Sequence, residues 1–141
     1  MKNMMLAAST LKMRILGLAL LIALVPYTSA FAESSSNTID AVGTVSSFND
    51  SPASGLWAAV ADFESGTGDI VAVFENEQGD IYVVTVRGDS AFEGEDLTIS
   101  GEGYLAKNGE LLTEGSGTAI INESGMEIRV SEDAVFGQTV S

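Results

Sequence analysis

Hydrophobic and polar residues alternate over short stretches from residue 38 to residue 131, and glycine-containing turns separate these stretches. Alternation with a period of two is typical of β-strands that bury one face, and no stretch shows a helical period. The pattern predicts strands at about 38–46, 55–63, 69–76, 80–87, 96–106, 110–121 and 126–131. Because the connections between them are short, we predict an all-β antiparallel meander of about seven strands that closes into a small barrel or a two-sheet sandwich.

The first 32 residues depart from this pattern. An apolar run at residues 15–25 follows Lys12 and Arg14, and Ala30-Phe31-Ala32 supplies the small residues that a signal peptidase recognises. We therefore predict a secretory signal peptide over residues 1–32. The expected localisation is secreted or periplasmic, with no membrane association after the signal peptide is cleaved.

The remaining residues, 33–141, are expected to form a single β domain. About 109 residues are enough to bury one hydrophobic core. The alternating pattern ends near Asp133, so we expect a loose C-terminal tail from about residue 133.

Asn108-Gly109 is the strongest turn signal in the sequence, because both residues accept the positive φ of a two-residue hairpin turn. This turn pairs Lys107 with Glu110, and the same register continued along the strands pairs Gly103 with Glu114. One face of this hairpin and of the following strand is apolar and is expected to form core: Leu97, Ile99, Leu105, Leu112, Ile120, Met126, Ile128 and Val130.

Glu114 is the exception on that apolar face. A carboxylate buried without a partner is costly, because its charge loses the solvation of water. Two interpretations remain: Glu114 is an inward carboxylate with a function, or a bend or bulge turns it out to solvent.

Four glycines lie midway along the same two strands, with Gly101 and Gly103 expected on the core face and Gly115 and Gly117 on the other. Glycine weakens a strand and is used where a sheet bends sharply or where another group approaches the backbone. The pattern favours barrel corners over a binding floor.

The hairpin around Glu77-Gln78-Gly79 has apolar residues on both faces. One face pairs Phe74 with Tyr82, Ala72 with Val84 and Ile70 with Val86, and is expected to form core. The opposite face carries Val71, Val73, Ile81 and Val83, which we predict to be a partner surface. The alternative is that the tail containing Val135 and Phe136, or a second sheet, covers this face.

Composition narrows the possible chemistry. The chain has no histidine and no cysteine, which excludes Ser-His and Cys-His catalysis and metal sites built on imidazole or thiolate. Signal cleavage would remove three of the six Lys and Arg and none of the 20 Asp and Glu, leaving a net charge of −17. Such a charge disfavours nucleic acid as a partner. We predict no cofactor and no metal site, although acidic loops such as residues 93–96 leave calcium binding open.

Two functions from different classes fit these observations, and neither is enzymatic. The first is a non-catalytic β module that acts by binding a protein partner or by self-association as a homo-oligomer. The alternative is a carrier that holds a small apolar ligand inside a β-barrel, with an interior lined by Trp57, Phe63, Phe74 and Tyr82. A filled interior favours the first, and an open cavity favours the second.

Overall fold

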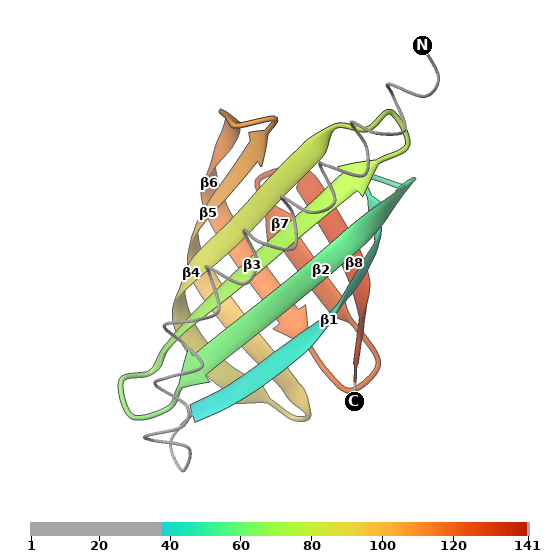
Figure 1. Ribbon diagram of the computed structural model, residues 1–141. Helices are drawn as coiled ribbons and strands as arrows, with labels where there is room; N and C mark the ends of the chain where they lie inside the picture. The colour runs from blue at the N-terminus through green and yellow to red at the C-terminus, as the bar shows by residue number, and fades with distance from the viewer. Residues whose placement is uncertain (1–37, 141) are drawn as a thin grey trace.

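The computed structural model describes residues 38–140, and within them the chain forms eight antiparallel β-strands joined by short turns (Figure 1). The strands are β1 (Thr38–Phe48), β2 (Ser51–Asp62), β3 (Thr67–Asn76), β4 (Ile81–Glu93), β5 (Asp96–Lys107), β6 (Glu110–Ile121), β7 (Met126–Val130) and β8 (Asp133–Thr139). Each strand pairs with the next, and β8 pairs with β1, so the sheet closes into a barrel. The all-β antiparallel meander is confirmed, and of the two predicted architectures the structure has the barrel. The predicted signal peptide, residues 1–32, lies outside the described residues.

The eighth strand is the main difference from the predicted fold. We predicted a loose tail from about residue 133, but these residues form β8, which pairs with both β7 and β1 and closes the barrel. Ala134 and Val135 are adjacent in sequence and both are buried. The strand therefore lacks the simple alternation by which the other strands were recognised.

Inward-pointing side chains fill the barrel. An eight-stranded barrel has an interior that is just wide enough for side chains to occupy. The largest fully buried side chains are Trp57, Phe74, Ile99, Leu105 and Ile128. Six of the predicted core residues belong to this interior cluster: Leu97, Ile99, Leu105, Met126, Ile128 and Val130.

A β-bulge between β5 and β6 changes the predicted register. Lys107 pairs with Glu110, as the Asn108-Gly109 turn predicts, but Leu105 pairs with Thr113, so Leu112 is an extra residue in β6. A shift of one residue moves every later side chain of a strand to the opposite face.

The bulge corrects three predictions on β6. Leu112 and Ile120 were expected in the core but are exposed, and Ala119 and Ile121 take the inward positions instead. Glu114 lies on the outer face beside Tyr104, where its side chain is exposed. The interpretation of Glu114 as an inward carboxylate is therefore wrong, and the physical cause is the bulge.

Glycines line up across four neighbouring strands. Gly68 pairs with Gly88, Gly88 with Gly101, and Gly101 with Gly117. A Cβ atom on Gly88 would overlap the carbonyl oxygen of Ser100, so the backbones approach too closely there for any side chain. The glycines thus mark a line of close backbone approach in the wall. Gly117, which was expected on the outer face, is buried because the bulge precedes it.

The turns of the meander alternate between the two ends of the barrel. We call the end where β1 begins and β8 finishes the terminal end; it contains the turns at residues 63–66, 94–95 and 122–125 (Figure 1). The far end contains the turns at residues 49–50, 77–80, 108–109 and 131–132.

Candidate functional site

The predicted ligand-lining residues do not surround an open space. Trp57, Phe74 and Tyr82 point into the barrel and belong to the interior cluster. Trp57 and Phe74 have no accessible surface (0%), so no space large enough for a water molecule adjoins them. Trp57 Nε1 also donates a hydrogen bond to the carbonyl oxygen of Gln138 in β8, 3.1 Å away, which fixes the indole across the closure of the barrel.

Phe63, the fourth predicted lining residue, lies at the terminal end instead of inside the barrel. It directly follows β2, and its side chain is 40% exposed. Its ring stacks on the ring of Phe92, with centroids 5.2 Å apart and planes inclined by 23°. The sequence reasoning missed Phe92 because it ended that strand at residue 87, whereas β4 continues to Glu93.

Three aromatic rings close the far end of the interior. Phe48, Phe74 and Tyr82 have ring centroids 4.7 to 5.3 Å apart. A hollow of about 220 Å³ lies beside Phe48 and Tyr82, between the turns at residues 49–50 and 77–80. The side-chain amides of Asn49 and Asn76 in its lining already donate to carboxylates of the same chain. The hollow has an aromatic floor, and Ser51, Glu77 and Gln78 also line it.

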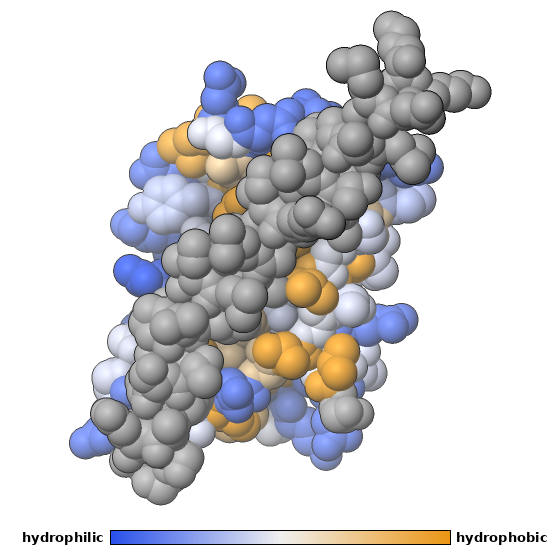
Figure 2. All heavy atoms as spheres, in the orientation of Figure 1, coloured by the Kyte–Doolittle hydropathy of each residue, from blue (hydrophilic) through white to orange (hydrophobic). Residues whose placement is uncertain are grey.

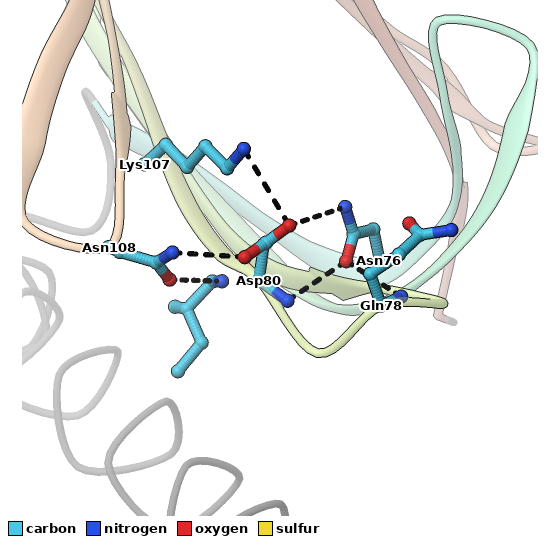
Figure 3. A network of polar contacts seen from close by, with 6 residues as sticks. Asn76, Gln78, Asp80, Lys107 and Asn108 are labelled. Carbon is cyan, nitrogen blue, oxygen red and sulfur yellow. Dashed lines mark hydrogen bonds and ion pairs between the residues drawn. The ribbon is translucent and has the colours of Figure 1, made fainter.

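A polar network joins two turns at the far end (Figure 3). Asp80 accepts hydrogen bonds from Asn108 Nδ2 at 3.0 Å and from Asn76 Nδ2 at 3.3 Å, and Lys107 Nζ lies 3.6 Å from its carboxylate. Asn76 Oδ1 accepts the backbone N–H groups of Gln78 and Asp80. The bonds from Asn108 and Asn76 hold the pKa of Asp80 below its ordinary value of 3.8, and Lys107 contributes in the same direction. The network is a clamp between the β3–β4 and β5–β6 hairpins.

Replacing Asn108 by glycine is expected to raise the pKa of Asp80 toward 3.8. Glycine keeps the positive φ of 50° that this turn position requires and removes the amide that donates to the carboxylate. Because folding lowers the pKa of Asp80, its stabilising effect is present above the unfolded-state pKa and is lost as the pH falls through the folded-state value. An NMR titration of the Asp80 carboxyl carbon measures the shift. An Asp80 pKa that is the same with and without the Asn108 amide would contradict the clamp.

The four residues of the predicted partner surface lie on the outer wall of β3 and β4. Val73 and Val83 are cross-strand neighbours, and Ile81 pairs with Glu75 at the far end of the same strands. Val71, Ile81 and Val83 are half-buried, and Val73 is 3% exposed. The tail does not fold back over this face, since its residues form β8 between β7 and β1.

The registers extend this surface across four strands. Two adjacent rows of outward residues contain no charge, and we call these eight residues the wall patch: Thr44, Leu56, Val73 and Val83 in one row, and Val42, Ala58, Val71 and Thr85 in the other. Val42 and Leu56 are 44% and 45% exposed, whereas Ala58 and Val73 are 3% exposed although neither belongs to the interior cluster. Where coloured atoms are visible in Figure 2, hydrophobic and hydrophilic side chains are interspersed on this side of the barrel.

Three cationic residues lie within residues 38–140, and each contacts a carboxylate. Arg87 pairs with Asp69, Lys107 with Asp80, and Arg129 with Glu127 at 2.9 Å. In this part of the chain no group of three or more carboxylates is placed to hold a metal ion. The same residues include no helix with the length and apolar character needed to span a membrane.

The fold and these surfaces define an eight-stranded antiparallel barrel with a filled interior and an uncharged patch on its outer wall. Comparisons of the chain with protein-family models, with curated proteins and with solved structures each found no match. The observations that bear on function are therefore those of the barrel itself.

Proposed function

We propose that the chain is a secreted or periplasmic, non-catalytic β module that acts by binding protein, and that the wall patch is its surface for self-association. The observation that supports this most directly is the patch itself, two adjacent uncharged rows on a chain with 20 acidic residues. Contiguous apolar area on the outside of a protein is typical of interaction sites.

The chemistry of the patch favours a second copy of the chain. Two strongly acidic copies repel each other wherever carboxylates would meet, and the wall patch is a region where they can approach without that repulsion. In a two-fold dimer the same patch lies on both sides, so it needs to complement only itself. Val42 and Leu56 would supply the newly buried apolar area, since each is nearly half exposed in the single chain.

Two other functions receive less support. A carrier of an apolar ligand needs space inside the barrel, and the side chains around Trp57 and Phe74 fill it. An enzyme of this composition would depend on its carboxylates, because the chain has no histidine and no cysteine. Asp80, a carboxylate whose pKa is lowered, is engaged in the clamp between hairpins.

Substitution of Leu56 by glutamate is expected to convert the self-associated protein to a monomer. A charge at the interface would be desolvated and would face its own copy across the two-fold axis. Leu56 is the better position than Val73, because Val73 is 3% exposed and a charge there would destabilise the single chain. Light scattering of the purified protein gives the particle mass, and the melting temperature shows whether the fold is intact.

Ile120→Glu is the matched control. Ile120 is exposed on β6, four strands away from β2 in the closed barrel, so its variant should keep the particle mass of the unmodified protein. Self-association is ruled out if the unmodified protein is a monomer. In that case a sharp fall in the melting temperature of Leu56→Glu would mean that the patch is covered within one chain.

A further inference from the structure

We infer that the terminal end of the barrel is a second binding surface, which takes an arginine-bearing basic segment of a partner protein. The surface consists of the stacked rings of Phe63 and Phe92 and the carboxylates of Glu64, Glu93 and Glu95. The inference rests on the proposed function, since it names the partner of a module that binds protein. It uses none of the wall-patch residues.

The same dipeptide, Phe-Glu, occurs at two neighbouring turns of the terminal end. Phe63-Glu64 follows β2, and Phe92-Glu93 ends β4 with Glu95 in the turn after it. The two rings stack on each other yet remain 40% and 50% exposed. Large apolar side chains in contact with water at an acidic end of the molecule gain hydrophobic stabilisation when a partner covers them.

Hydrogen bonds hold the turn at residues 63–66 in place and join it to β4. Asp62 Oδ1 accepts the backbone N–H of Glu64 at 2.9 Å, and Gly66 provides the positive φ of 73° at which the chain reverses. The backbone N–H of Ser90 in β4 donates to the carbonyl oxygen of Gly66 at 2.9 Å. The ring pair is therefore built on ordered backbone, and a partner would lose little free energy in arranging it.

Aromatic faces beside carboxylates are the groups that bind a guanidinium. Arginine is planar, stacks on aromatic rings and presents a fork of N–H donors to carboxylates, whereas the lysine ammonium is a compact, strongly hydrated point charge. Glu64, Glu93 and Glu95 lie at the same two turns as the stacked rings, so a basic segment that covers the rings also meets negative charge.

The negative charge of the terminal end favours a different protein as the partner over a second copy of this chain. The turns at residues 63–66, 94–95 and 122–125 contain no lysine or arginine. The three cationic residues among residues 38–140 contact carboxylates elsewhere. A second copy placed end to end would bring its own carboxylates against Glu93 and Glu95, and anionic lipid or nucleic acid would be repelled in the same way.

The test is a titration of the purified protein with short synthetic peptides of equal length at low salt. Arginine alternates with serine in the first peptide, lysine with serine in the second, and glutamate with serine in the third. We expect the arginine peptide to bind more tightly than the lysine peptide and the glutamate peptide not to bind. Backbone NMR shifts on binding should centre on residues 62–66 and 91–96.

Variants separate stacking from general charge attraction. Phe92→Ser is expected to weaken binding of the arginine peptide about fivefold, because it removes one ring face from the site. Glu93→Gln with Glu95→Gln should weaken it as well, and these exposed substitutions keep the fold. Leu111→Ser is the control, since Leu111 is exposed at the far end and should leave the affinity unchanged.

Three outcomes would overturn the inference: no binding of the arginine peptide, equal affinity for the arginine and lysine peptides, or unchanged affinity in Phe92→Ser. The last, combined with a lower melting temperature, would mean that the ring pair only closes the end of the barrel. These outcomes are separate from the test of the proposed function. Leu56→Glu reports on particle mass and the wall patch, so either surface can fail while the other stands.

Discussion

Deletion of residues 133–141 is expected to abolish cooperative folding of the barrel. The deletion removes β8 and leaves β1 and β7 without a partner strand on one side. It also removes the buried side chain of Val135 and the Gln138 carbonyl to which Trp57 donates. Burial of one valine contributes about 1.5–3 kcal/mol, and the lost strand pairing adds to this, against a total stability of about 5–15 kcal/mol for an ordinary domain. Near-UV circular dichroism of the single tryptophan, followed through a thermal melt, measures the loss.

The matched control removes only residues 140 and 141. Val140 is exposed, and its described contribution to closure is a backbone hydrogen bond to the carbonyl oxygen of Val42. Because β8 stays intact, the melting temperature should fall by no more than about 5 °C. If the longer deletion melted cooperatively at the temperature of the full chain, residues 133–139 would be the loose tail that the hydrophobic pattern predicts.

The β3–β4 hairpin could be predicted from the sequence together with its register. The predicted pairs of Phe74 with Tyr82 and of Ile70 with Val86 are the pairs in the structure. Both faces of this hairpin are apolar, so the register follows from the turn, because the length of the loop at Glu77-Gln78-Gly79 fixes which residues of the two strands pair. The same register placed Val71 and Val83 together on the outer wall.

The β5–β6 hairpin could be predicted only near its turn. Leu111 and Leu112 are adjacent apolar residues, so a pattern with a period of two does not decide which of them faces inward. In the structure a bulge at this point leaves both leucines exposed and brings Ala119 into the core. In β6 it is Ala119, and not the expected core residue Ile120, that lies opposite Ile128 of β7.

The candidate sites divide in the same way between local and distant contacts. The wall residues of β3 and β4 follow from alternation within one hairpin, which a sequence displays directly. The contact between Phe63 and Phe92 joins turns that belong to different hairpins. This contact depends on how the barrel coils and on where β4 ends. The alternation of apolar and polar residues within one strand predicts neither of these features.

Gly88→Ala is expected to destabilise the barrel by about 3 kcal/mol. Gly88 lies within the row of glycines that crosses β3 to β6, between Gly68 and Gly101. The added Cβ would overlap the carbonyl oxygen of Ser100 and lie 2.7 Å from the Cα of Gly101, and both atoms belong to the backbone of β5. Neither can rotate away, so the strands must separate and weaken the hydrogen bonds between them. Chemical denaturation measures the change in the free energy of unfolding.

Gly115→Ala in β6 makes the same chemical change where the neighbouring group can move. Its Cβ would lie 2.5 Å from the Ser131 hydroxyl oxygen, the end of a flexible side chain, and the other contact within reach is Ser131 Cβ at 3.9 Å. Alanine also restricts the unfolded chain, which favours folding by about 0.4–1 kcal/mol in both variants. Gly115→Ala should therefore leave the stability within about 1 kcal/mol of the unmodified protein. Equal losses of stability in the two variants would contradict this explanation. They would mean that any replacement of glycine in these strands is destabilising, whether or not the backbones approach closely.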